Sequence, residues 1–81
     1  MHDIICDMDE RKFQKAREQL GSQLKKTRES KKMTQSEVAR LAGIHVNYFA
    51  RIERGEENPS FDVLYAIAKA LKVKLSELFK F

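Results

Sequence analysis

Apolar residues recur along most of this chain at spacings of three and four, the period of an amphipathic α-helix. Over residues 9–31, the residues that share one stripe are Phe13, Arg17, Leu20 and Leu24. No run alternates apolar and polar residues for long enough to predict a strand. The pattern therefore predicts an all-α fold. Gly21 interrupts the first helical segment, so two helices broken at that residue are the alternative to one long helix.

Capping signals place the boundaries of the next two helices. Thr34 and Glu37 have the spacing of a capping box, in which each side chain bonds the backbone N–H of the other residue. Gly43 then provides the left-handed conformation that ends this helix. The following helix is predicted over residues 45–54. Histidine is a poor capping residue, so we expect His45 to leave the start of that helix less firmly fixed.

Two further helical segments are predicted near the C-terminus. Pro59 excludes helix at the residue before it, and Ser60 caps the helix that follows. Ser76 caps a last short turn. The five predicted helices enclose one core, whose candidate residues are Leu24, Val38, Ile44, Phe49, Ile52, Leu64, Ile67, Leu71, Leu75 and Leu78.

The charge is distributed unevenly along the 81 residues, which are enough for one small domain. The net charge is +4. Residues 1–18 hold four Lys or Arg and five Asp or Glu, whereas residues 19–81 hold twelve and seven. We therefore divide the chain into an N-terminal extension over residues 1–18, partly helical, and a basic domain over residues 19–81. A basic domain favours a polyanionic partner.

Several classes of protein are not supported by the sequence. The single cysteine, Cys6, excludes an internal disulfide and a cysteine-based zinc site, and it fits a reducing compartment. His2 and His45 lack the spacing of metal ligands, and no motif of a hydrolase or a nucleotide-binding enzyme occurs. No apolar run reaches the ~18 residues of a membrane span, and the acidic start differs from a signal peptide. We expect a cytoplasmic protein that is not an enzyme, uses no cofactor or metal, and has no membrane partner or small-molecule effector.

The most specific pattern lies in residues 35–54, QSEVARLAGIHVNYFARIER. It predicts two short helices joined at Gly43, with apolar residues such as Phe49 and Ile52 where the helices meet. Ala39 is small enough for the second helix to cross close above it. This is the pattern of a helix-turn-helix, whose second helix enters the major groove of DNA.

From about residue 20 to residue 79, the chain resembles the lambda-repressor-like (Cro/repressor-type, XRE) helix-turn-helix family. The motifs that carry the resemblance are MTQSEVA at residues 33–39, the Gly43 turn, IERG at residues 52–55, NPS at residues 58–60, AKAL at residues 68–71 and LSELF at residues 75–79. His45 and Tyr48, together with IERG, resemble the controller proteins of restriction-modification systems. The resemblance implies a compact five-helix domain that binds a palindromic operator in double-stranded DNA as a homodimer and regulates transcription, with residues 45–54 as the recognition helix.

The resemblance also implies roles for individual residues of that helix. Val46, Asn47 and Arg51 occupy base-reading positions of the family. Their chemistry suits the task, because Arg51 can donate two hydrogen bonds to guanine, Asn47 can pair with adenine, and Val46 can contact a thymine methyl. His45 replaces the Ser or Thr with which the family often starts this helix, and we expect it to contact DNA. An ordinary solvated helix face is the alternative for these residues.

A second set of residues is expected to contact DNA phosphates. The family uses the glutamine that corresponds to Gln35 for this purpose, at a helix start where free N–H groups favour an anion. The full set is Thr34, Gln35, Ser36, Tyr48, Arg54 and Asn58. A purely structural cap is the alternative for Thr34, and half-buried packing is the alternative for Tyr48.

Two more sets of residues are assigned to holding the structure together. The resemblance implies an ion pair between Arg28 and Glu53, which would fix the angle between two helices. The candidate dimer residues are apolar and lie near the C-terminus, namely Val73, Leu75, Phe79 and Phe81. Phe13 in the N-terminal extension is a further candidate. The alternative is that these side chains pack within a single copy of the chain.

Two other functions are compatible with the sequence. The same fold can serve as a protein-interaction module, such as an antitoxin-like or adaptor domain. A nonspecific basic DNA-binding protein is the other alternative, and it would bind a palindromic site and random duplex alike.

Overall fold

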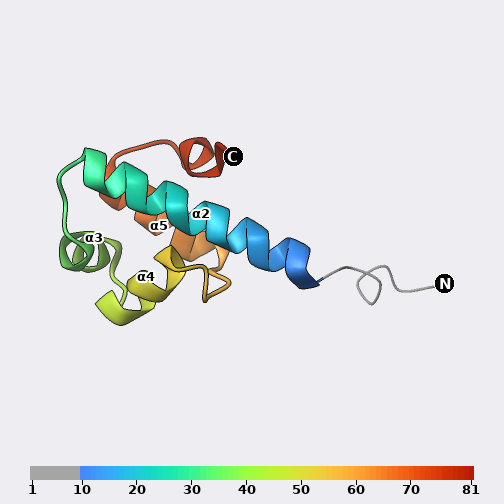
Figure 1. Cartoon of the computed structure of the whole chain (residues 1–81). Coiled ribbons are helices and arrows are strands. Elements are labelled where there is room, and N and C mark those ends of the chain that lie inside the picture. The colour runs from blue at the N-terminus through green and yellow to red at the C-terminus, as the bar shows by residue number, and fades with distance from the viewer. Residues whose placement is uncertain (1–9) are drawn as a thin grey trace.

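The computed structural model describes residues 10–81, so the predictions for His2 and Cys6 lie outside the described residues. Within this range the helices are α2 (Glu10–Ser30), α3 (Gln35–Ala42), α4 (Val46–Glu53) and α5 (Phe61–Leu71), followed by a 3-10 helix, η1 (Leu75–Phe79). Residues 10–81 contain no strand, so the all-α prediction is confirmed for them. Figure 1 shows α2 as the longest element, with α3 and α4 on one side of it and the C-terminal turn on the other.

The prediction of five α-helices is wrong for the last element. The last element is a 3-10 helix, in which the Glu77 N–H donates to the Lys74 carbonyl three residues earlier. Lys74 rather than Ser76 precedes it, and no side chain caps it. At the other end, α2 runs through Gly21 without a break, so the prediction of one long helix is confirmed and the alternative of two helices broken at that residue is wrong. Residues 10–18 of the predicted extension therefore belong to the same helix as the start of the predicted domain.

The predicted caps account for the ends of the short helices. Thr34 accepts a hydrogen bond from the Glu37 N–H, and the Glu37 side chain accepts one from the Thr34 N–H, so the capping box is complete. The Ser60 hydroxyl accepts from the Val63 N–H at the start of α5. These bonds satisfy backbone donors that a helix start would otherwise leave unpaired. None of the helices in the described residues combines the length and apolarity needed to span a membrane.

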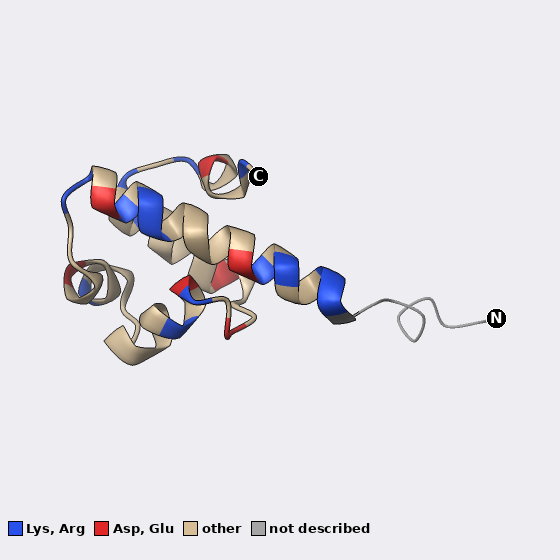
Figure 2. Ribbon diagram, in the orientation of Figure 1, with Lys and Arg blue, Asp and Glu red and all other residues tan. Residues whose placement is uncertain are grey.

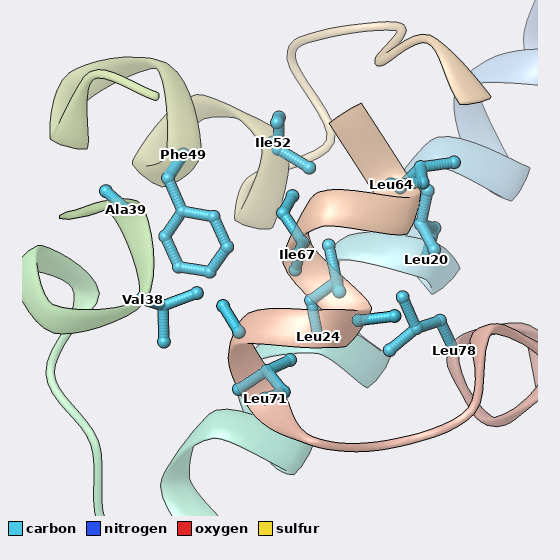
Figure 3. Packing of buried hydrophobic residues seen from close by; sticks show 12 residues of the cluster. Leu20, Leu24, Val38, Ala39, Phe49, Ile52, Leu64, Ile67, Leu71 and Leu78 are labelled. Atoms are coloured by element: carbon cyan, nitrogen blue, oxygen red, sulfur yellow. The ribbon is translucent and has the colours of Figure 1, made fainter. Parts of the chain in front are cut away.

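The core draws side chains from every element (Figure 3). Its largest fully buried members are Phe49, Leu24, Ile52, Ile67, Leu71, Leu78 and Val38. Full burial of an aliphatic or aromatic side chain of this kind contributes roughly 1.5–3 kcal/mol. Two predicted core residues, Ile44 and Leu75, are only partly buried and pack against the cluster from outside. Leu20 was not predicted as core, but it is 7% exposed and joins the cluster from α2.

Candidate nucleic-acid interface

The turn between α3 and α4 sets the geometry of the candidate interface. Gly43 ends α3 with φ of 75°, and its N–H donates to the Arg40 carbonyl. The Ile44 N–H donates to the Ala39 carbonyl at 3.0 Å, which closes the left-handed helix end known as a Schellman motif. Ala39 itself is 1% exposed. The chain therefore reverses within three residues, and α4 packs directly against α3.

His45 caps α4, contrary to the expectation that histidine would leave this helix start less fixed. Its Nδ1 accepts a hydrogen bond from the Asn47 N–H at 3.1 Å. A ring nitrogen that accepts carries no proton, so the neutral imidazole holds its proton on Nε2. The His45 ring thus provides the N-cap hydrogen-bond acceptor that is usually a Ser or Thr hydroxyl. The His45 side chain remains exposed.

The base-reading candidates differ in how much of each is accessible. Phe49 and Ile52 bury one side of α4 against the core. Asn47 is exposed, whereas Val46 and Arg51 are half-buried. Val46 packs partly against the core, so only part of its side chain is available to a thymine methyl. Asn47 and Arg51 therefore share the side of α4 that the core leaves uncovered, and Val46 lies at the edge of that side.

Arg51 is held by two neighbours. Its Nε donates to Glu57 Oε2 at 2.8 Å, and about a third of the Glu57 side chain is exposed. Its guanidinium carbon lies 6.0 Å from the centre of the Tyr48 ring, within the range of a cation–π contact. Tyr48 is half-buried and packs against the core, as the packing alternative for this residue anticipated. Sequence reasoning missed Glu57, although the two acidic residues that follow Arg51 and Arg54 within a few positions were the available signal.

Arg54 forms a second, more exposed ion pair. Its Nε and Nη2 donate to the two carboxylate oxygens of Glu56 at 3.1 and 3.2 Å. These hydrogen bonds hold the pKa of the Glu56 carboxyl below its usual value and raise the pKa of Arg54. Both side chains are more than half exposed, so the pair adds little to stability. Figure 2 shows the acidic positions of the connection after α4 close to the basic positions of the helix.

The start of α3 holds three of the predicted phosphate contacts. Thr34 is engaged in the capping box, and its hydroxyl keeps a proton that it can donate. Gln35 is half-buried, and its Nε2 donates to Glu53 Oε1 at 2.8 Å. That amide nitrogen carries a second N–H. Ser36 is exposed. The structure thus gathers these residues at one helix start and ties Gln35 to the end of α4.

Arg28 and Glu53 form the ion pair that the resemblance implied. Arg28 donates from Nε to Glu53 Oε2 at 2.7 Å and from Nη2 to Oε1 at 3.2 Å. Its Nη1 donates to the Met33 carbonyl at 2.9 Å. The hydrogen bond to Glu53 raises the pKa of Arg28 against the opposing effect of burial. Glu53 is 8% exposed and also accepts from Gln35, so one buried carboxylate links α2, α3 and α4.

Four of the remaining predicted residues line a groove of about 650 Å³ between α2 and the C-terminal segment. Its lining includes Phe13, Leu20, Asn58, Pro59, Phe79 and Phe81. Asn58, a predicted phosphate contact, therefore groups with the candidate dimer residues. Phe79 and Phe81 are 45% and 55% exposed. Val73 and Leu75 are mainly packed against the core, which favours an intramolecular role for those two.

Several known proteins are similar to this chain in sequence and in fold. A model of the HTH_3 family, a helix-turn-helix, matches residues 24–78. The immunity repressor protein of Bacillus phage phi105 is 37% identical over 59 residues, which make up 73% of this chain and 41% of the repressor. Control protein C.SmaI of Serratia marcescens is 30% identical over 74 residues, which make up 91% of this chain and 81% of C.SmaI.

A solved structure agrees with both the fold and the sequence match. The crystal structure of the restriction-modification controller protein C.AhdI from Aeromonas hydrophila is similar with a TM-score of 0.77 and 32% identity, over 78% of this chain and 96% of C.AhdI. The chain thus spans less than half of the phage repressor but most of the two controller proteins. Because the family match covers more than half of the chain, the chain belongs to the HTH_3, or XRE-type, family of helix-turn-helix DNA-binding transcription regulators.

Proposed function

We propose that this protein is a sequence-specific transcription regulator that binds a palindromic operator as a homodimer, with α4 in the major groove. The single observation that carries the proposal is the asymmetry of α4. Phe49 and Ile52 bury one side of the helix, and the uncovered side presents Asn47 and Arg51. A helix braced in this way can enter a groove about 12 Å wide without exposing the core.

Base reading is assigned to the uncovered side of α4. The Arg51 guanidinium donates to guanine O6 and N7, and the Asn47 amide pairs with adenine N6 and N7. The exposed part of Val46 contacts a thymine methyl, and the exposed edge of the His45 ring offers its Nε2 proton to an acceptor. Each well-formed bidentate contact distinguishes the correct base by about 1–3 kcal/mol.

Phosphate contacts are assigned to the ends of the two helices. The start of α3 offers free backbone N–H groups and the second Gln35 amide proton to a phosphate, and Thr34 and Ser36 add hydroxyl donors. Tyr48 and Arg54 contribute a hydroxyl and a guanidinium from α4. Asn58 has the weakest support, because it lines the groove near Phe79.

Homodimer formation is assigned to the groove between α2 and the C-terminus. Phe79 and Phe81 are exposed, their ring centres are 6.2 Å apart, and Phe13 faces the same groove from α2. If a second copy of the chain covered these three rings, a contiguous apolar surface would be removed from water. Two copies with recognition helices ~34 Å apart would read two half-sites one helical turn apart. We place this activity in the cytoplasm, without a small-molecule effector.

Selection of bound sequences from a pool of random duplex DNA tests base reading. We expect one palindromic consensus from the full-length chain. Arg51→Ala and Asn47→Ala should each relax the preference at one base pair of the half-site by about 1–3 kcal/mol, measured by fluorescence anisotropy on single-base variants. Arg54→Ala is the control, because loss of a phosphate contact should weaken all duplexes alike and lower the salt slope by about 1. Identical selected sequences from the wild type, Arg51→Ala and Asn47→Ala would refute the assignment.

Analytical ultracentrifugation tests the dimer. Phe81→Ser should weaken self-association by about tenfold or more, because an exposed aromatic anchor at an interface commonly carries that much of the binding energy. Phe61→Ser provides a matched control, since Phe61 is 66% exposed but does not line the groove. An equal effect of the two substitutions, or a wild-type chain that stays monomeric, would speak against this surface.

A protein-interaction module on the same fold is the second candidate. The observation that favours it is an exposed ring pair on α5, in which Phe61 and Tyr65 stack with centres 6.2 Å apart. Salt dependence separates the two functions. A DNA reader loses duplex affinity steeply as salt rises, whereas an adaptor shows no specific retention on duplex at any salt concentration.

A further inference from the structure

Arg51 is restrained in a way that leaves a particular pair of donors available. The guanidinium has five N–H donors in a planar fork. The bond to Glu57 uses Nε, at 2.8 Å, and lies along one edge of the fork. The Tyr48 ring supports the guanidinium at 6.0 Å. The two terminal groups, Nη1 and Nη2, are therefore the pair that can reach the O6 and N7 atoms of a guanine while the bond to Glu57 stays in place.

The backbone that carries Glu57 is itself tied to α4. Gly55, with φ of 77°, turns the chain back after the helix. Its N–H donates to the Ile52 carbonyl at 3.0 Å, and the Glu56 N–H donates to the Arg51 carbonyl at 2.9 Å. These two bonds form a Schellman motif, which fixes the start of the connection relative to the last turn of the helix. Glu57 thus approaches Arg51 from a defined position rather than from a freely moving loop.

Stability does not account for a carboxylate in this position. The Arg51 and Glu57 side chains are 43% and 32% exposed, and ion pairs at such exposure contribute little to folding. Beside DNA, a carboxylate repels the phosphates and so weakens binding to every duplex alike. Because the Glu57 carboxylate weakens DNA binding and contributes little to folding, we look for its role in the complex with DNA. Orienting the neighbouring Arg51 side chain is such a role.

We infer that Glu57 is a positioning residue for base recognition, which holds the Arg51 fork in its reading orientation before DNA arrives. This inference rests on the proposed function of Arg51. Immobilising a long side chain on binding costs free energy, and an arginine already held by Glu57 and Tyr48 has less freedom to lose. This saving in free energy favours binding to the correct base, because only a guanine edge matches both terminal groups of Arg51 at once. Glu57 therefore raises selectivity more than affinity.

The test compares neighbouring carboxylates in the full-length chain. The probes are a duplex that carries the selected consensus, its single-base variants at the guanine read by Arg51, and a scrambled duplex of equal length. Glu57→Ala should bind the consensus about 2- to 10-fold more weakly and lose preference at that guanine, with unchanged or tighter binding to scrambled duplex. Glu57→Gln keeps an oxygen acceptor for Nε and should restore part of the preference.

Glu56→Ala is the matched control, because it removes the same charge one residue away but leaves Arg51 paired with Glu57. It should not change the preference at that guanine. Combining Glu57→Ala with Arg51→Ala should cause no further loss of preference at that guanine beyond the loss in Arg51→Ala alone. Equal effects of Glu56→Ala and Glu57→Ala would reduce the role to general repulsion and overturn the inference. The inference would also be overturned if Glu57→Ala kept the guanine preference while Arg51→Ala lost it. If Arg51→Ala itself keeps the preference, the proposed reader is wrong and this inference falls with it.

Discussion

Glu53→Ala is expected to lower the free energy of unfolding by about 3–5 kcal/mol, because it leaves a buried guanidinium without its counter-charge. Only 11% of the Arg28 side chain and 3% of the Glu53 side chain are exposed. After the substitution, Arg28 keeps the Met33 carbonyl as an acceptor but loses both carboxylate oxygens. A domain of this size has a total stability of roughly 4–12 kcal/mol, so the substitution removes a large share of that stability.

Urea unfolding followed by circular dichroism measures this effect, and two further variants isolate its cause. Arg28→Met combined with Glu53→Leu removes both charges and fills similar volume, so it should recover much of the lost stability. Glu56→Ala breaks the exposed pair with Arg54 and should change the midpoint little. A double variant as unstable as Glu53→Ala would show that packing, rather than the stranded charge, dominates. A Glu53→Ala midpoint equal to that of the wild type would remove the structural role altogether.

The same carboxylate connects stability to the proposed interface. Glu53 accepts from Gln35, the residue expected to contact a phosphate from the start of α3. Arg28 approaches Glu53 from α2 and also bonds the chain just before α3. The network therefore fixes the start of α3 relative to the end of α4, which sets the spacing between the proposed phosphate contacts and the proposed base contacts. Loss of Glu53 should impair DNA binding even in molecules that remain folded.

Local signals were sufficient to predict most of the fold. The Thr34 and Glu37 spacing, the glycine at residue 43 and the proline at residue 59 act on the backbone within a few residues, so each one could be interpreted from the sequence alone. Most of the predicted core residues are buried, but Ile44 and Leu75 lie at the edge of the cluster, and the buried Leu20 was not predicted. The pair between Arg28 and Glu53 is separated by 25 residues, and only the resemblance to a known family suggested it.

The features that were missed depend on contacts between distant or unusual partners. The capping role of His45 requires a particular ring rotation, which residue preferences for helix starts do not contain. The bond between Glu57 and Arg51 depends on how the chain turns back after α4. Gly21 was interpreted from helix propensity as a possible break, whereas its role is set by α4, which lies about 30 residues further along the chain.

Gly21→Ala is expected to destabilise the protein by about 2–3 kcal/mol, although alanine is the better helix former by about 1 kcal/mol. Gly21 is buried where α2 crosses the end of α4. A Cβ at this position would lie 2.6 Å from the Ile52 carbonyl oxygen and closer still to that of Glu53. Both obstacles are backbone atoms, which cannot rotate away as a flexible side chain could. The helices would have to separate, and the separation would stretch the bonds between Arg28 and Glu53.

A neighbouring substitution separates crowding from helix propensity. Ser22→Ala lies next in the same helix but is exposed, so it should leave stability unchanged or raise it slightly. Urea unfolding of Gly21→Ala, Ser22→Ala and the wild type measures the difference directly. If Gly21→Ala were as stable as Ser22→Ala, the close approach of α2 and α4 would be wrong. We expect this order of stabilities because Gly21 has no side chain and therefore lets α2 and α4 touch. That contact sets the orientation of α4.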